Sequence, residues 1–571
     1  MNQTPRGRLV VIVAGLAAAA LFVLGRLVML QVAQHAEFER LAQGVQVIYR
    51  DVWPDRGRIF DRNGNLLAGN ITDYRVGASP RLIADADRAA QELAQLLDRP
   101  VEDLAASLKR KEAPYVLLAV PVQSQVGRAI EALDLSGIQL EPLVRRTYPH
   151  GRLASHLLGF VGLDRQGYGG VEAYYQRELA GEPALSPTRH DPLGQSLGPR
   201  PKPGLDLILT LDLDIQYVAE TTLAQALQDT GAKSGTVIVM DPRTGAILAM
   251  TSLPDYDPNV PPTRADEDVR RNPAISDQYE PGSVFKILTM AIALDQGVVT
   301  PETTYTDLGF VEIGGAVIRN WDGRVYGEQD MTGLLAHSLN VGAALVANWI
   351  GPDRFYAGLQ RFGIGQPTGV DLANEASGIL RLPGDEDWHE ADLATNAFGQ
   401  GVAVTPLQMI TAVAAVANHG VMMQPHIVKE TVQDGVHHVN VPRPSPYAPQ
   451  GQVISPQAAD QLKAMLAEAV KREIRRAQVP GYAIAGKTGT AQIARPGGFY
   501  DPEKTIASFI GFFPVDEPQV IILVKLDEPT SSAWGSLTAA PVFKALAERI
   551  AVILEIPPDE VRKVAEGGGG N

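Results

Sequence analysis

Residues 279–290 read Tyr-Glu-Pro-Gly-Ser-Val-Phe-Lys-Ile-Leu-Thr-Met, a Pro-Gly pair followed by an apolar periodic run. Such a pattern is typical of a loop that enters a helix. It predicts Ser283 in the first helical turn, where backbone N–H groups have no partner inside the helix. Lys286 lies three residues later on the same predicted face, so the two side chains can touch.

A serine hydroxyl becomes a nucleophile only when a base takes its proton. Lys286 can be that base when it is neutral, and burial beside a second cation lowers the pKa of a lysine. The alternative is a helix-capping serine with a solvated lysine, which is the usual meaning of an isolated Ser-x-x-Lys pattern. The assignment therefore depends on two further strings.

The second string is Ser338-Leu339-Asn340, between an apolar segment and a small-residue helix predicted over 341–349. It is expected in a short turn between helices. There Ser338 would relay a proton between Lys286 and a leaving amine, and Asn340 would hydrogen-bond the backbone of the acyl donor. The alternative is a plain helix N-cap, worth about 1 kcal/mol of stability.

The third string is Lys487-Thr488-Gly489-Thr490, after an apolar strand predicted over 482–486. Gly489 would let backbone approach the substrate closely. Lys487 and Thr488 would hold a substrate carboxylate, and Lys487 would be the second cation beside the base. The N–H of Thr490, with that of Ser283, would form an oxyanion hole, in which one donor is typically worth about 2.7–4 kcal/mol. The alternative is a surface turn with a solvated lysine.

No cofactor or metal is expected at this site. The ten histidines are scattered, and no His-x-x-x-His pair accompanied by a carboxylate occurs. His337 adjoins the second string and invites comparison with a Ser-His-Asp triad, but Lys286 already supplies a base. We therefore interpret His337 as structural.

Composition excludes several classes of protein. The 571 residues carry a formal net charge of −15, which makes a nucleic-acid partner improbable on electrostatic grounds. The absence of cysteine excludes disulfides, thiolate catalysis and Cys-ligated metals.

The amino-terminal segment predicts a membrane anchor. Residues 9–25 are uncharged and mostly apolar, Arg26 interrupts, and 27–33 continue the run. A bilayer core needs about 20 helical residues, which 9–33 supply if Arg26 snorkels or faces a partner. Arg6 and Arg8 favour a cytoplasmic tail over 1–8, with everything beyond the helix outside the cytoplasmic membrane. The alternative is a cleaved signal peptide, but no convincing cleavage site follows.

The rest of the chain predicts an α+β fold. A helix continuing over 35–47 and a type I′ hairpin at Asn63-Gly64 come first. Residues 181–204 hold six prolines and four glycines and are interpreted as an extended linker. Strands are expected over 205–211, in a hairpin over 235–251, over 504–513 and over 520–526. Mostly helical sequence lies between 275 and 480, so one sheet is expected to join the first and last segments.

At this point the chain resembles the class B penicillin-binding proteins, monofunctional peptidoglycan D,D-transpeptidases. The resemblance covers nearly the full length. Besides the three strings it rests on these segments: Arg56–Ala68, Arg145–Pro149, Gly169–Glu172, Phe398–Gly401, Thr405–Gln408 and Ala507–Gly511. It implies a membrane helix, an elongated pedestal domain, and a catalytic domain with an antiparallel sheet flanked by helices and an all-α subdomain.

The resemblance also implies domain limits and partners. The expected organisation is a cytoplasmic tail over 1–8, an anchor over 9–33, a pedestal of the dimerisation type over 34–204, a transpeptidase domain over 205–556 and a flexible tail over 557–571. The implied substrates are D-Ala-D-Ala stem peptides, the implied inhibitors are β-lactams, and the implied partners are a SEDS-family glycosyltransferase and other membrane proteins of division or elongation.

The implied reaction has two halves. Ser283 attacks the D-Ala-D-Ala bond and D-Ala leaves, and then an amine of a neighbouring stem peptide attacks the acyl-enzyme. Septal and elongation subtypes share the three strings. The length, the 509–514 stretch and the ending around 540–543 favour the septal subtype. Leu339 within the second string, His337 before it, and a 531–536 loop without a Gly-rich run depart from common family patterns.

Three other functions remain as alternatives: a β-lactamase or antibiotic sensor with the same strings, a D,D-carboxypeptidase, and a non-catalytic scaffold of the division or elongation complex. A β-lactamase needs a positioned deacylating base and rarely carries an anchor with a pedestal. The scaffold is disfavoured because every catalytic residue type is present.

Overall fold

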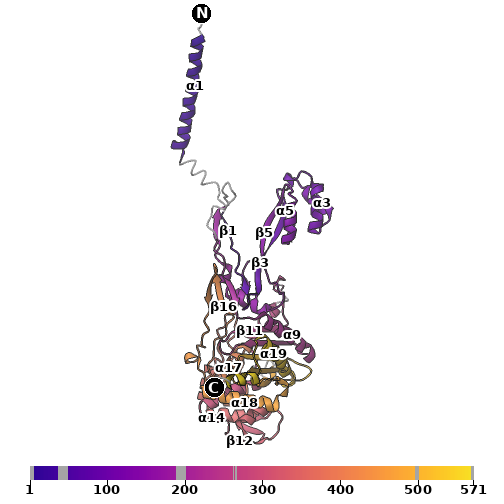
Figure 1. Ribbon diagram of the computed structural model, residues 1–571, viewed down its shortest axis with the longest axis vertical. Coiled ribbons are helices and arrows are strands. Elements are labelled where there is room, and N and C mark those ends of the chain that lie inside the picture. The colour runs from indigo at the N-terminus through magenta and orange to yellow at the C-terminus, as the bar shows by residue number, and fades with distance from the viewer. Residues whose placement is uncertain are drawn as a thin grey trace. The chain divides into compact units, whose positions relative to one another are not determined.

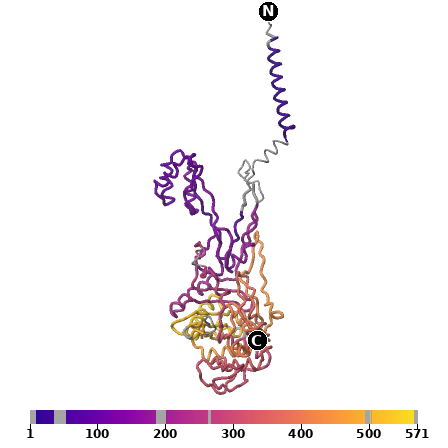
Figure 2. The backbone as a smooth tube through the Cα atoms, turned by 180° about the vertical axis from the view of Figure 1, so that it is seen from behind, coloured from indigo at the N-terminus to yellow at the C-terminus, as the bar shows by residue number. Residues whose placement is uncertain are grey.

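The computed structural model describes residues 5–35, 49–187, 201–261, 263, 267–494 and 500–567 (Figures 1 and 2). The chain divides into two compact units. The first comprises Met1–Pro54 and Gly181–Pro203, and the second comprises Asp55–Ala180 and Gly204–Asn571.

The first unit holds an apolar helix and a two-stranded ribbon. Helix α1 (Pro5–Val28) continues into the π-helical η1 (Met29–Ala33). Among the described residues, Leu9–Ala33 is the one helix long and apolar enough to cross a membrane. Of the helix expected over 35–47, all but His35 lies outside the described residues.

The ribbon departs from the linker expected over 181–204. Strand β8 (Ala184–Pro187) pairs antiparallel with β1 (Tyr49–Val52). Residues 188–200 of the expected linker lie outside the described residues. A strand this short leaves no periodic pattern in a proline-rich sequence, so the sequence did not indicate it.

The second unit begins with a seven-stranded sheet. Its order is β17-β16-β9-β2-β3-β4, and β5 also pairs with β3. The strands are β2 (Ile59–Phe60), β3 (Leu66–Ala78), β4 (Val116–Val122), β5 (Ile138–Thr147), β9 (Asp206–Leu209), β16 (Val428–Gln433) and β17 (Val436–Val439). This sheet crosses the domain limit expected at 204, because β9, β16 and β17 come from beyond it.

The hairpin predicted at Asn63-Gly64 exists, but its turn differs from type I′. Gly64 has a φ of 89°, whereas Asn63 is not among the residues with positive φ. The carboxylate of Asp61 accepts hydrogen bonds from the backbone N–H groups of Asn63 and Asn65, at 2.9 and 2.7 Å. An aspartate that bonds its own following backbone replaces the two-residue turn.

Helices connect successive strands of this sheet. Helices α3 (Ala86–Leu97), α4 (Val101–Leu108) and α5 (Ser124–Ala132) contribute to one apolar cluster with β3 and β4. Two further short helices, α7 (Gly170–Tyr174) and α8 (Gln176–Ala180), are separated at Tyr175.

A five-stranded antiparallel sheet forms the centre of the carboxy-terminal part of the second unit, in the order β11-β10-β20-β19-β18. Its strands are β10 (Ser234–Met240), β11 (Ile247–Leu253), β18 (Ala485–Ala494), β19 (Tyr500–Phe513) and β20 (Val520–Asp527). The predicted union is confirmed for the 235–251 hairpin and the last strands, since β10 pairs with β20 along its length. The strand expected over 205–211 is β9, which lies in the seven-stranded sheet instead.

Both faces of this sheet are covered by helices. Val237 and Val239 of β10 belong to the core shared with α9 (Leu213–Thr230) and α19 (Ala539–Ile553). The alternate residues Ile238 and Met240 belong to the core shared with α12 (Lys286–Asp295), α17 (Pro406–Ala417) and α18 (Pro456–Glu473). A sheet buried on both sides explains why its strands are apolar at nearly every position.

Two regions depart from the expected pattern. Within the described residues, the stretch expected to be mostly helical over 275–480 contains six short strands: β12 (Thr304–Asp307), β13 (Phe310–Ile313), β14 (Ala316–Arg319) and β15 (Gly327–Asp330), together with β16 and β17 of the seven-stranded sheet. Helices α13 (Met331–His337), α14 (Asn340–Ile350), α15 (Pro352–Arg361) and α16 (Glu390–Asn396) follow.

The tail expected to be flexible over 557–571 contains helix α20 (Asp559–Gly567). The carboxylate of Asp559 accepts a hydrogen bond from the backbone N–H of Ala483 at 2.7 Å. Arg562 forms ion pairs with Asp559 and with Asp516. These long-range polar contacts hold the helix, and nothing in the local sequence indicated them.

Candidate active site

Ser283 lies where the sequence predicted, at the entrance to a helix. A short 3₁₀ segment, η4 (Gly282–Phe285), leads into α12, which begins at Lys286. Gly282 has a φ of 57°, and a Cβ there would lie 2.8 Å from the carbonyl oxygen of Thr490. The backbone before the serine thus packs directly against β18, and only glycine permits that approach.

Lys286 lies at the centre of a cluster drawn from two of the strings. Its side chain is 1% exposed. The Nζ atom lies 3.2 Å from Ser283 Oγ and 2.8 Å from Asn340 Oδ1. It also lies 2.6 Å from the carbonyl oxygen of Ser338 and 3.3 Å from its Oγ. Burial, followed by the charge of Lys487, lowers the pKa of Lys286 well below its ordinary value and so favours the neutral amine.

The second string occupies the predicted turn between helices. Ser338 follows α13 with a φ of 58°, a left-handed conformation that is uncommon for serine. Asn340 is the first residue of α14, and its Nδ2 donates to the carbonyl oxygen of Arg319 at 3.2 Å. The strained turn directs both the carbonyl and the hydroxyl of Ser338 toward the Lys286 amine.

Lys487 completes the cluster from β18. It is 1% exposed, and its Nζ donates to Ser338 Oγ at 2.9 Å. Burial lowers its pKa to about 7. The Ser338 hydroxyl therefore lies between two buried amines. The structure brings Ser283, Lys286, Ser338, Asn340 and Lys487 into one connected set.

The strand that carries the third string differs in its limits from the prediction. It begins at Ala485 and continues through the motif, where Lys487 pairs with Ile510 and Gly489 with Ser508. Thr488 and Thr490 are half-buried. A Cβ on Gly489 would lie 2.9 Å from the carbonyl oxygen of Pro281, so this glycine permits a close approach within the protein itself.

The 531–536 loop, which the sequence marked only as a departure from the family pattern, packs beside the motif strand. The backbone N–H of Gly535 donates to Thr490 Oγ1 at 3.3 Å. The neighbouring Trp534 meets Trp321 edge-on, with ring centroids 4.8 Å apart. Trp321 in turn donates from Nε1 to the carbonyl oxygen of His337 at 3.2 Å. The only sequence signal for this pair was the rarity of tryptophan, of which the chain has five.

The Phe398–Gly401 string lies beside the nucleophile. The backbone N–H of Gly282 donates to the carbonyl oxygen of Gly399 at 3.1 Å. The carboxylate of Glu280 accepts from the N–H of Gly401 at 2.9 Å and from the hydroxyl of Tyr500 at 3.0 Å. The segment before Ser283 is therefore anchored from two sides.

The contacts of His337 differ from those of a histidine in a Ser-His-Asp triad. Its Nδ1 lies 3.5 Å from Glu473 Oε1, and its ring lies against Tyr326 at 5.1 Å. Within the described ranges, no group of three or more His, Cys, Asp or Glu residues is placed to hold a metal ion.

Two families match the chain. The family described as penicillin-binding protein transpeptidase domain matches residues 235–548, and the one described as penicillin-binding protein dimerisation domain matches residues 51–209.

Two curated relatives and one solved structure illustrate the similarity. Stage V sporulation protein D of Bacillus subtilis is 35% identical and covers 86% of this chain and 77% of its own. The probable peptidoglycan D,D-transpeptidase PbpC of Pseudomonas aeruginosa is 32% identical and covers 98% of both chains. The crystal structure of penicillin-binding protein 3 of Mycobacterium tuberculosis, complexed with aztreonam, has a TM-score of 0.70 and 28% identity, covering 89% of this chain and 98% of that one.

Proposed function

Because the chain belongs to the class B penicillin-binding proteins, serine-type peptidoglycan D,D-transpeptidases, we propose that Ser283 is the residue that carries the acyl group. The observation that carries the proposal is the Lys286 amine, buried and 3.2 Å from Ser283 Oγ. A neutral amine at that distance is placed to take the serine proton.

In the first half-reaction, Lys286 removes the proton from Ser283 and Oγ bonds to the carbonyl carbon of the D-Ala-D-Ala peptide bond. The N–H groups of Ser283 and Thr490 hold the resulting oxyanion. Ser338 passes a proton from the Lys286 amine to the departing nitrogen, and D-Ala leaves. Support for the relay is the place of Ser338 Oγ between Lys286 Nζ at 3.3 Å and Lys487 Nζ at 2.9 Å.

In the second half-reaction, an amine from a neighbouring stem peptide attacks the ester carbon, and Ser283 recovers its proton. Until D-Ala leaves in the first half-reaction, Lys487 and Thr488 hold the terminal carboxylate of the donor, and Gly489 permits the strand to lie close to it. Asn340 positions both the Lys286 amine, through Oδ1, and the acyl donor. The chemistry requires no cofactor, because an amine and a hydroxyl supply every proton transfer.

The proposal also assigns each segment of the chain to the cytoplasm, the membrane or the outside. Residues 1–8 lie in the cytoplasm, 9–33 anchor the chain in the membrane, and the pedestal over 34–204 and the transpeptidase domain over 205–556 lie outside. A SEDS-family glycosyltransferase contacts the helix and the pedestal and supplies the glycan. We assign the septal rather than the elongation role, on the 509–514 stretch and the ending around 540–543.

Acylation by a fluorescent penicillin tests the site. Ser283→Ala should abolish labelling of the full-length protein in detergent, whereas Ser377→Ala, at an exposed serine, should leave it intact. Slow loss of the adduct supports a transpeptidase, and rapid turnover would indicate a β-lactamase. Product analysis with an added amine acceptor separates transpeptidation from carboxypeptidation. Growth that survives Ser283→Ala in cells would favour the scaffold.

Localisation of a fluorescent fusion tests the role in the cell. The septal assignment expects the fusion at the division site. Uniform labelling of the side wall would indicate the elongation role instead.

A further inference from the structure

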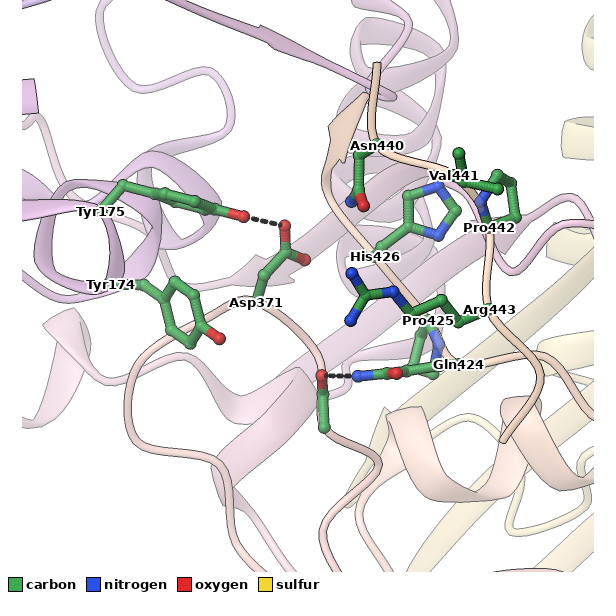
Figure 3. A pocket seen from close by; sticks show the side chains of 11 residues that line it. Tyr174, Tyr175, Asp371, Gln424, Pro425, His426, Asn440, Val441, Pro442 and Arg443 are labelled. Atoms are coloured by element: carbon green, nitrogen blue, oxygen red, sulfur yellow. Dashed lines mark hydrogen bonds between the residues drawn. The ribbon is translucent and has the colours of Figure 1, made fainter. Parts of the chain in front are cut away.

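A second polar cavity lies in the second unit, away from the three strings. Its volume is about 230 Å³, and none of the described residues that line it belongs to those strings. Figure 3 shows the side chains that converge on it from the end of α7, from the loop around residue 370, from the segment before β16 and from the segment after β17.

Among the described residues of the lining, Asp371 is the one carboxylate, and it already accepts three hydrogen bonds. Tyr175 donates its hydroxyl to Asp371 Oδ2 at 2.7 Å. The backbone N–H groups of Ile427 and Val428 donate to the two carboxylate oxygens at 2.6 and 2.9 Å. Asp371 therefore joins the loop to β16.

Arg443 supplies a positive charge to the cavity lining, and its guanidinium is not used in contacts of the kind that Asp371 makes. Its guanidinium has no hydrogen bond or ion pair with any residue in the described part of the chain, and Figure 3 shows it pointing toward the side where Asp371 and Tyr174 lie. Its backbone is fixed, because its carbonyl oxygen accepts from the N–H of Gln424 at 2.9 Å. An arginine held at its base and unpaired at its tip is suited to an incoming anion.

The other polar groups add donors and acceptors around that charge. Tyr174 is half-exposed, and burial of its ring raises the pKa of its hydroxyl, which therefore remains a donor. Asn440 donates Nδ2 to the carbonyl oxygen of Val428, which leaves its Oδ1 as an acceptor. Burial lowers the pKa of His426, so the imidazole is neutral near pH 7. Val441 and Pro442 supply an apolar wall.

We propose that this cavity binds the carboxylate end of a peptide. A planar carboxylate matches the fork of the Arg443 guanidinium, whereas the neighbouring Asp371 disfavours a dianion such as phosphate. Asn440 Oδ1 is placed for a peptide N–H, and the apolar wall suits a small alkyl side chain. The inference rests on the proposed function, because the polymer whose stem peptides the enzyme joins carries such ends in many copies. A second weak site on a repeating polymer increases its effective concentration at the first.

The test uses the full-length protein in detergent after acylation with benzylpenicillin, which blocks the catalytic site. The probes are a synthetic stem tetrapeptide ending in D-Ala, its C-terminal amide, and inorganic phosphate, with binding followed by calorimetry. The free carboxylate should bind. The amide, and the free peptide on Arg443→Gln, should bind roughly tenfold more weakly or worse. Tyr174→Phe should weaken binding by a smaller factor.

Arg110→Gln, at an exposed arginine on the pedestal, is the matched control and should bind the peptide as the unsubstituted protein does. The proposal is overturned if the acylated protein binds no peptide, or if the amide binds equally well. Unchanged binding by Arg443→Gln, or phosphate binding as tightly as the peptide, would also overturn it. Failure of acylation itself would refute the proposed function, whereas acylation without peptide binding refutes only this inference.

Discussion

Lys286 is the residue on which the proposed chemistry depends. Replacement by methionine keeps the buried stem and removes the amine that lies 3.2 Å from Ser283 Oγ. We expect acylation by penicillin to slow by about 10²–10⁴-fold, the usual contribution of a general base. Stopped-flow acylation measures the effect. Lys463→Met, at another buried lysine that pairs with Asp460 on α18, should acylate normally. Equal slowing in both variants would assign the effect to loss of a buried lysine in general.

Lys286 and Lys487, the two buried lysines of the site, also predict a pH profile. Acylation should rise as pH rises through the pKa of Lys286, which burial and the charge of Lys487 lower well below its ordinary value, because only the neutral amine accepts a proton. Affinity for a carboxylate substrate should fall above pH 7, because burial lowers the pKa of Lys487 to about 7 and the neutral form binds no anion.

The profile for a carboxylate substrate is therefore bell-shaped, and its alkaline limb belongs to Lys487. The second-order acylation constant is measured with a D-Ala-D-Ala thioester analogue and with the methyl ester of its terminal carboxylate. The methyl ester should retain the acid limb and lose the alkaline one. An alkaline limb that persists with the uncharged analogue would contradict a carboxylate-binding role for Lys487.

At the scale of elements, the sequence predicted whatever depends on local pattern. Short apolar runs, bounded in the hairpin by turn residues, located β10, β11, β19 and β20, and the Pro-Gly pair located the start of η4. Four-residue strands such as β12 and β8 escaped prediction, because their pairing depends on partners distant in sequence. For the same reason the residue types of the site were predictable, whereas the left-handed turn at Ser338 and the Trp321–Trp534 contact were not.

That tryptophan contact joins the two elements that carry the second and third strings. Trp321 is hydrogen-bonded to the end of α13, and Trp534 adjoins Gly535, which bonds to Thr490 on β18. Edge-to-face aromatic pairs contribute about 0.5–1.5 kcal/mol beyond the area that they bury. A double-mutant cycle with Trp321→Ala and Trp534→Ala, measured by urea unfolding, should yield a coupling free energy in that range.

The control cycle pairs Trp534→Ala with Tyr217→Ala, at an exposed tyrosine on α9. Distant sites usually add to within about 0.3–0.5 kcal/mol, so this cycle should show no larger coupling. A coupling between the two tryptophans no greater than the control would mean that the rings touch without joining the two elements energetically.

At the scale of the whole second unit, one buried carboxylate ties together segments that are far apart in sequence. Glu172 of α7 is 0% exposed and accepts from Arg56, which precedes β2, and from Arg146 of β5. Arg146 also donates to the carbonyl oxygen of Gly57 at 2.7 Å. Burial alone would raise the pKa of Glu172, but the charges of Arg146 and Arg56 outweigh it and hold the pKa below its ordinary value. The carboxylate therefore stabilises the fold in its ionised form.

Glu172→Gln removes that charge and leaves two arginines buried without it. Breaking a buried ion pair by removing one partner typically costs about 3–5 kcal/mol, so the free energy of unfolding at pH 7 should fall by that order. Glu141→Gln removes an exposed ion pair with Arg75 and should cost at most about 1 kcal/mol.

Because the folded pKa is lowered, the contribution of Glu172 is present above the unfolded pKa of about 4.3 and is lost as pH falls through the folded value. Urea unfolding across this range should show a steeper acid loss in the unsubstituted protein than in Glu172→Gln. Identical acid limbs in the two proteins would mean that Glu172 is not the group whose protonation loosens this part of the fold.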